Sequence, residues 1–145
     1  MNLKVITIQQ KEDLDKAFKI RGEVFIEEQK VPREEEYDAF EEESVHYLAL
    51  FDTEPCGTCR WRFTGEGIKL ERFAVSKSYR NIKVGSALMK ACLDGISNHE
   101  DFKGQLLYLN AQIEAMPLYT KFGFQPTGNT FLECDIVHQK MTKKV

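Results

Sequence analysis

The sequence predicts an α/β (α+β) domain in which helices cover a mixed β-sheet of about six to seven strands. Several short runs alternate apolar and polar residues, as half-buried strands do. Two longer segments repeat apolar residues every three or four positions, as amphipathic helices do. The 145 residues, of which 42% are hydrophobic and 30% charged, can bury a core of their own. We therefore expect one domain spanning residues 1–145.

The first half of the chain begins with a strand-like run over residues 3–8. Residues 12–28 carry apolar side chains at helical spacing, and Pro32 closes this predicted helix because a proline disfavours helical geometry in the residue before it. Three further strand-like runs follow at 45–51, 58–63 and 68–75. The first two are joined by a predicted turn around Pro55 and Gly57, and the next two by a turn at 65–67.

The second half of the chain continues the alternation of helices and strands. Residues 84–96 have helical spacing, 105–110 form a strand-like run and 117–122 a short helix. Two more strand-like stretches reach Met141. The predicted order is β-α-β-β-β-α-β-α-β-β, which favours a mixed sheet with helices packed against it.

Charge and composition exclude several classes of partner. The net charge of −3 and the isoelectric point near 5.7 provide no overall basic field for a nucleic acid. No stretch approaches the roughly 20 apolar residues that span a bilayer, and residues 1–10 lack the apolar run of a signal peptide. We therefore expect no nucleic-acid or membrane partner, a cytoplasmic location and four free cysteine thiols.

The segment 70–89 is the most informative part of the chain. A predicted strand ends at Val75, a polar turn follows, and a helix opens near Lys83. The first amides of a helix lack internal partners and the helix dipole is positive there, so such a start can receive phosphate. Arg80 adds a positive charge and Gly85 permits close approach of the backbone. From these residues alone, an ordinary strand-turn-helix with an exposed arginine is an equally good interpretation.

The pattern Val75-x4-Arg80-x2-Lys83-x-Gly85-x2-Leu88 resembles motif A of the GNAT acetyltransferase superfamily. The resemblance implies that the loop amides hold the pyrophosphate of coenzyme A and that the preceding strand pairs with its pantetheine arm. Lys83 stands where the family has its first glycine. The coenzyme-binding residues that this resemblance implies are Phe73, Ala74, Val75, Arg80, Asn81, Ile82, Lys83, Val84, Gly85, Ser86 and Asn110.

A second motif lies at the appropriate distance. Asn110-Ala-Gln-x-x-Ala115-x3-Tyr119-x-Lys121-x-Gly123-Phe124 resembles motif B of the same superfamily. Four further segments resemble the small bacterial ElaA/YjcF-like acetyltransferases, and these segments are 21–32, 60–62, 70–72 and 131–141. The likeness covers nearly the whole chain.

The resemblance implies an acetyl-CoA-dependent N-acetyltransferase that passes an acetyl group directly to a primary amine, with acetyl-CoA as co-substrate and without a metal. The acceptor is then a small-molecule amine or an amine of a protein or peptide, and a homodimer is compatible with the sequence. The alternative is a non-catalytic acyl-CoA-binding module, which only Lys83 favours.

Tyr119 is the predicted catalytic proton donor, because similar family members use the tyrosine at this point of motif B to protonate the leaving thiolate. A phenol is protonated at neutral pH, as such a donor must be. A tyrosine that only packs in the core is the alternative interpretation.

The general base is expected at Glu71, which period two would place on the same strand face as Phe73 and Val75. Arg60 and Arg62 on a neighbouring strand could instead pair with this carboxylate as part of the structure. His46 and His138 are alternative bases, although a histidine on a strand more often satisfies a local hydrogen bond.

Two other patterns are not assigned a function. Cys56-Gly-Thr-Cys59 has thioredoxin-like spacing, but both flanks are strand-like and the pair would lie in a hairpin turn, so we expect neither redox chemistry nor zinc. Seven acidic residues fall within 34–43. We expect a solvated, partly mobile loop there, the alternative being a negative lip that attracts a cationic amine.

Overall fold

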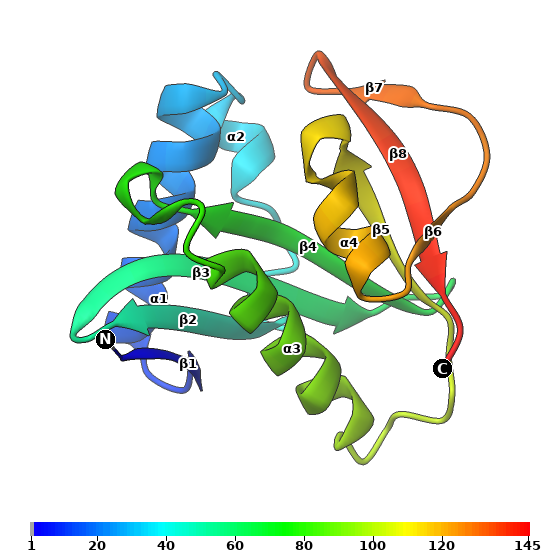
Figure 1. The fold of residues 1–145 in the computed structure, drawn as a ribbon, viewed down its shortest axis with the longest axis horizontal. Coiled ribbons are helices and arrows are strands. Elements are labelled where there is room, and N and C mark those ends of the chain that lie inside the picture. Colours follow the sequence, from blue (N-terminus) through cyan, green and yellow to red (C-terminus); the bar gives the residue numbers. More distant parts are fainter. Residues whose placement is uncertain (1) are drawn as a thin grey trace.

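The computed structural model of the protein describes residues 2–145, which form an eight-stranded sheet with helices on both faces (Figure 1). The strands are β1 (Leu3–Thr7), β2 (Val45–Phe51), β3 (Glu54–Phe63), β4 (Ile68–Val75), β5 (Leu107–Gln112), β6 (Gln125–Pro126), β7 (Phe131–Glu133) and β8 (Ile136–Lys143). The helices are α1 (Lys11–Arg21), η1 (Gly22–Glu28), α2 (Arg33–Glu36), η2 (Lys77–Tyr79), α3 (Val84–Ser97), η3 (Ile113–Ala115) and α4 (Met116–Lys121). The predicted α/β class is confirmed, and the sheet has eight strands where the predicted order has seven.

The strand order is β1-β2-β3-β4-β5-β8-β6, with β7 paired to the other part of β8. All neighbouring strands are antiparallel except β4 and β5, whose parallel pairing requires the crossover that α3 provides. These two strands pair only at Ile68–Leu107 and Lys69–Tyr108. Beyond this point they diverge, as the fork between them in Figure 1 shows. The sheet is therefore split between β4 and β5 beyond Lys69 and Tyr108.

The two faces of the sheet carry separate cores. On one face, α3 and α4 pack over a large cluster that includes Trp61, Leu70, Leu109 and Met141. On the other face, α1 and the first turn of η1 pack over a smaller cluster that includes Leu48 and Ala74. Figure 1 shows α3 in front of the strands and α1 behind them. Each core follows from the apolar stripe of its helix, since an amphipathic helix buries only one face.

The predicted helix over 12–28 is two segments of different geometry. It is an α-helix to Arg21 and then continues as a π-helix from Gly22 to Glu28. Short π-helical segments widen the backbone ring and often lie at functional sites. Here the segment ends directly before Gln29, whose side chain reaches β5.

The turn predicted around Pro55 and Gly57 is wrong, because both residues lie inside β3. The chain reverses earlier, at Asp52, which has a positive φ of 55°. Cys56 and Cys59 are therefore buried strand residues rather than residues of a hairpin turn. A side chain at Gly57 would meet Val84 Cγ1 at 2.8 Å, so this glycine lets the start of α3 pack directly on the strand.

A bulge in β4 changes which face its side chains occupy. Arg72 has a positive φ of 60°, and the β3–β4 register shifts between Thr58 and Arg60. Leu70 and Phe73 therefore both pack on the α3 face, although strict alternation would separate them. The expectation that Glu71 shares a face with Phe73 is wrong, because the extra residue of the bulge places Glu71 on the α1 face.

No helix within residues 2–145 has both the length and the apolar character needed to cross a bilayer.

Candidate active site

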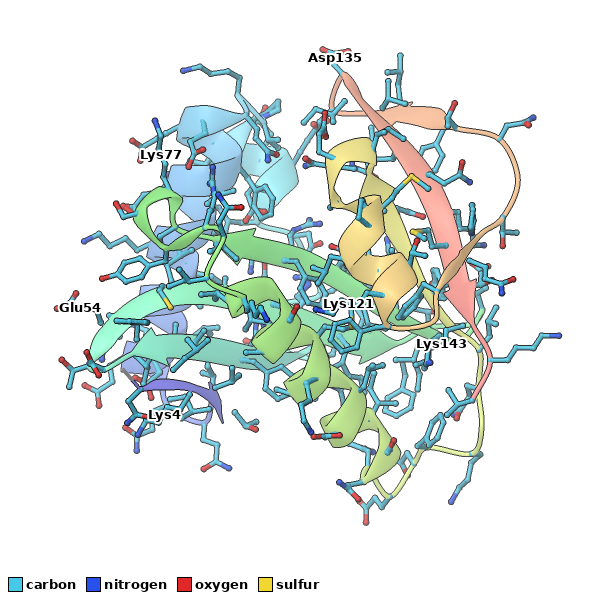
Figure 2. The ribbon with its side chains drawn as sticks, viewed as in Figure 1. Lys4, Glu54, Lys77, Lys121, Asp135 and Lys143 are labelled. Carbon is cyan, nitrogen blue, oxygen red and sulfur yellow. The ribbon has the colours of Figure 1, made fainter. Side chains whose placement is uncertain are left out.

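A cavity lies where β4 and β5 separate. It has a volume of about 180 Å³, and side chains from both strands, from η1 and from α4 line it. The β7–β8 hairpin closes one side. Its tip, marked by Asp135 in Figure 2, carries Cys134, whose thiol donates a 2.9 Å hydrogen bond to the Glu35 carboxylate on α2. The cavity therefore passes between the two halves of the sheet.

Tyr119 enters this cavity from α4, on the α3 face. Its ring meets the Phe73 ring edge-on at a centroid distance of 5.7 Å, and only 7% of the residue is exposed. Within residues 2–145 its hydroxyl makes no hydrogen bond. No fully enclosed side-chain nitrogen or oxygen of these residues lacks a partner, so this hydroxyl is not fully enclosed. Burial raises the pKa of Tyr119, and the neighbouring Cys59 and Cys92 raise it further. The phenol therefore keeps its proton at neutral pH, and its residue lines the cavity.

The loop before α3 contains two residues in the left-handed region. Asn81 and Lys83 both have φ of 70°, and Lys83 is the residue directly before the first turn of α3. The family resemblance places a glycine at Lys83, and glycine adopts this conformation without strain. The lysine adopts this left-handed conformation here. Within residues 2–145 no side chain caps the α3 start, and the first amides of a helix have no partner inside the helix.

Gly85 lies where α3 and α4 approach each other. A side chain on this residue would meet Leu118 Cδ2 at 3.1 Å. Close by, Lys121 Nζ donates to Ser86 Oγ at 3.5 Å (Figure 2 labels Lys121). The two motifs found in the sequence are therefore in contact, and Gly85 leaves room for α3 and α4 to pack closely.

The Arg80 side chain already binds two groups within the protein. Its guanidinium donates to the Val75 carbonyl at 3.0 Å and forms a 2.8 Å ion pair with Glu28 of η1. The loop is thereby joined to the end of the π-helix. Ile82 is exposed, whereas Val84 is buried in the core and offers only its backbone to the surface.

The free edge of β4 presents backbone groups to the cavity. Ser76 N–H donates to the Cys56 carbonyl at 2.9 Å, which makes Val75 and Gly57 a non-hydrogen-bonded pair. The N–H of Val75 therefore points away from β3, toward the gap. Ala74 has the opposite orientation, with its side chain buried in the α1 core.

The β5 side of the cavity carries polar residues on the α1 face. Asn110 and Gln112 line it, and Gln112 pairs directly with His138 of β8, which lines it too. The Gln29 and Gln112 side chains hydrogen-bond to each other across the opening. No sequence pattern predicts this pair, although Gln29 lies in a segment that resembles the ElaA/YjcF-like group.

Glu71 is surrounded by cations. Its carboxylate accepts hydrogen bonds from Arg60 at 2.9 Å and from Arg62 at 2.8 Å, and Lys69 lies 3.4 Å away. Burial alone would raise the pKa of Glu71, but the arginines and the lysine outweigh it and lower the pKa. A carboxylate held in its ionised form in this way is a weak proton acceptor.

The expectation of a solvated loop at 34–43 is wrong for three of the seven acids, while the other four are exposed. Glu36, Asp38 and Glu41 turn inward and bind the buried guanidinium groups of Arg21 and Arg60 at 2.7–2.8 Å. Arg72, displaced by the bulge, adds contacts to Glu36 and Asp38. We call these residues, together with Glu71 and Arg62, the arginine–carboxylate cluster. The expectation failed because composition alone does not show which acids face a buried cation.

The comparisons with known proteins agree with this architecture. The family model described as "Acetyltransferase (GNAT) domain" matches residues 7–145. The uncharacterized N-acetyltransferase YjcF of Bacillus subtilis (strain 168) is 39% identical over 142 residues, which cover 97% of this chain and 99% of that protein. The chain therefore belongs to the GNAT acetyltransferase family and is an N-acetyltransferase.

Within the family it is an ElaA/YjcF-like member. The crystal structure of Escherichia coli ElaA superposes with a TM-score of 0.80 at 25% identity over 99% of both chains. A GNAT acetyltransferase of Elizabethkingia anophelis, solved with acetyl-CoA bound, superposes with a TM-score of 0.75 over 99% of both chains. The identity of that second pair is 17%, so it shows a shared fold.

Proposed function

We propose that this N-acetyltransferase uses acetyl-CoA and passes the acetyl group directly to a primary amine. The observation that carries the proposal is the separation of β4 and β5 beyond Lys69, with Tyr119 lining the resulting cavity. A thioester in this opening could be reached by a proton donor on one face and by an amine from the other.

The residues around the opening fit acetyl-CoA. The uncapped amides at the start of α3 and the Lys83 ammonium suit a pyrophosphate, since both favour negative charge. The free N–H of Val75 suits a pantetheine amide, which can continue the sheet along the β4 edge. Ile82 is exposed beside this path, and Arg80 could supply charge if it released Glu28.

Tyr119 is the proposed acid. When the carbon–sulfur bond breaks, the phenol donates its proton to the departing thiolate, for which general-acid catalysis typically contributes about 10²–10⁴-fold in rate. The packing against Phe73 holds the ring in one orientation. We propose that Glu71, by contrast, stabilises the arginine–carboxylate cluster, because its charge is already shared among several cations.

The acceptor amine is proposed to enter on the α1 face, beside the Cys134–Glu35 hydrogen bond that joins the β7–β8 hairpin to α2. Glu35 and Glu133 line this entrance, and a carboxylate-lined opening attracts an ammonium group. Both small amines and lysine side chains of proteins meet this description. We also propose that the chain functions as a single domain in the cytoplasm, since its four cysteines are free and the Sγ atoms of Cys59 and Cys92 remain 3.7 Å apart.

The alternative of a non-catalytic acyl-CoA-binding module had only Lys83 in its favour. Since Lys83 adopts the backbone conformation expected of the family glycine, the substitution gives no reason for lost turnover.

The test is the release of free thiol from acetyl-CoA in the presence of 1,4-diaminobutane, ethanolamine, glucosamine or a lysine-containing peptide, with the products identified by mass spectrometry. We expect at least one amine to gain an acetyl group and Tyr119→Phe to slow that reaction. Butyryl-CoA and malonyl-CoA serve as competing donors. Faster transfer from either one, or coenzyme A binding without any transfer, would contradict the proposal.

A further inference from the structure

The hydrogen bond of His138 defines the protonation of its ring. Its Nδ1 lies 2.8 Å from the carbonyl oxygen of Ile136. A carbonyl oxygen only accepts hydrogen bonds, so Nδ1 must carry the proton. In the neutral ring, Nε2 is then an unprotonated acceptor.

The other two histidines are held in the opposite form. Nε2 of His46 lies 2.8 Å from the Glu41 carbonyl and is therefore the protonated nitrogen. The backbone N–H of Asp101 donates to Nδ1 of His99, which must then be the acceptor. Of the three histidines in the chain, His138 alone is held with Nε2 free to accept a proton.

The position of His138 directs this nitrogen to the cavity. The residue is 9% exposed and lines the cavity, and its ring stacks on Phe131 at a centroid distance of 5.9 Å. Within residues 2–145, Nε2 has no hydrogen-bond partner, yet no fully enclosed side-chain nitrogen or oxygen lacks one. The atom therefore borders open space, and the cavity is the space that this side chain lines.

His138 lies on the face of the sheet opposite Tyr119. It pairs directly with Gln112, and Ala111, the residue before Gln112 on β5, points into the core under α3 and α4. Because adjacent strand positions alternate, His138 and Gln112 point to the α1 face. This is the face from which the amine is proposed to approach.

We propose that Nε2 of His138 is the general base that deprotonates the acceptor amine. The proposal rests on the proposed function and adds the residue that makes the amine nucleophilic. Of the carboxylates that line the cavity, Glu71 and Glu36 are bound by arginines and Glu35 accepts the Cys134 thiol. Glu133 is exposed to solvent at the entrance. The free acceptor inside the cavity is therefore the imidazole.

In the proposed reaction, Nε2 of His138 takes one proton from the acceptor ammonium, and the amine nitrogen forms a bond to the thioester carbon. The carbon–sulfur bond breaks, and the thiolate takes the phenolic proton of Tyr119. The second proton that the nitrogen loses as the amide forms restores the phenol, and His138 releases its proton to solvent.

The first test needs no acceptor. Long-range ¹H–¹⁵N spectra of the ¹⁵N-labelled protein distinguish the two neutral tautomers of each histidine, and His→Gln variants assign the signals. We expect His138 with the proton on Nδ1 and His46 and His99 with it on Nε2. A proton on Nε2 of neutral His138 would overturn the proposal, whether or not the proposed function holds.

The second test is kinetic and uses the amine of the panel that reacts fastest. His138→Gln should lower kcat by about 10²–10⁴-fold, the usual range for general-base catalysis, while the calorimetric Kd of acetyl-CoA stays unchanged. The wild-type rate should fall toward low pH as the base gains a proton, and the variant should lose this dependence.

His99→Gln is the matched control, since His99 lies outside the cavity, and it should behave as wild type. Free imidazole should restore part of the rate of His138→Ala. Unchanged kcat and an unchanged acid limb in a folded His138→Gln would show that another group takes the proton. Failure of all variants to bind acetyl-CoA, the wild type included, would instead refute the proposed function.

Discussion

The side chains of Gln29 and Gln112 hydrogen-bond to each other in both directions across the cavity, although 83 residues separate them. Gln112 Nε2 donates to Gln29 Oε1 at 2.8 Å, and the return contact is 3.3 Å. The pair joins the residue that follows the π-helix to β5. Beyond the fork, strand pairing no longer connects the β4 side of the cavity to the β5 side. The pair therefore spans the two walls that the diverging strands leave apart.

We expect this pair to couple the two walls energetically. Gln29→Ala and Gln112→Ala should each lower the free energy of unfolding, and a double-mutant cycle should give a coupling of about 1 kcal/mol, because both side chains lose the same bonds. Urea unfolding measures each term. Gln105→Ala removes an exposed loop amide and should combine additively with Gln112→Ala. Additivity in the Gln29 pair would contradict the coupling.

Tyr119→Phe should lower turnover by about 10²–10⁴-fold and leave the Kd of acetyl-CoA nearly unchanged, since the ring and its contact with Phe73 remain. Steady-state thiol release and calorimetry on the same preparation measure the two quantities. Tyr108→Phe is the control, because its hydroxyl contacts Thr64 outside the cavity and its loss should spare turnover. Normal turnover in Tyr119→Phe would assign sulfur protonation to another group.

Lys83→Gly should weaken acetyl-CoA binding and reduce the salt dependence of the Kd, since it removes a charge near the expected phosphates. Lys83→Ala removes the same charge but keeps a side chain at a φ of 70°. The glycine variant should therefore be more stable than the alanine variant by about 1 kcal/mol, the usual cost of left-handed backbone for a residue with a Cβ. Equal stabilities by thermal unfolding would show that this backbone carries no strain.

Arg60→Met should destabilise the protein by about 3–5 kcal/mol, because it leaves the carboxylates of Asp38, Glu41 and Glu71 without their shared buried partner. Lys90→Met, which removes one exposed ion pair with Asp94, should cost no more than about 1 kcal/mol. Chemical unfolding of both variants measures the difference. A small effect of Arg60→Met would mean that the cost of burying these charges cancels the stability gained from their ion pairs.

The cluster should also govern acid unfolding. Burial would raise the pKa of Asp38, but Arg60 and a backbone amide lower it to about 2, and the pKa values of Glu41 and Glu71 are lowered too. A folded-state pKa below the unfolded value adds stability above about pH 4 that disappears toward pH 2. Burial raises the pKa of Glu36, so its contribution has the opposite sign. Between pH 7 and pH 2, the free energy of unfolding should fall less steeply in Arg60→Met than in the wild type.

Most elements of the fold could be predicted from hydrophobic period, and the two sequence motifs lie in contact as α3 and α4 pack together. The face of Glu71 could not be predicted, because one bulged residue, Arg72, reverses the alternation and nothing in the local sequence requires it. The role of Glu36 and Asp38 was hidden for a related reason. Their partners Arg21, Arg60 and Arg72 come from distant segments, which only the assembled sheet brings together.

The fork between β4 and β5 has a consequence for the order of events in turnover. A donor lying along β4 on the α3 side would leave the proposed amine entrance on the α1 face open, so each substrate would have its own route to the point of reaction. Neither needs to depart before the other arrives. Initial rates measured at several fixed concentrations of the second substrate should therefore give intersecting rather than parallel reciprocal plots, and the two products should leave by separate routes.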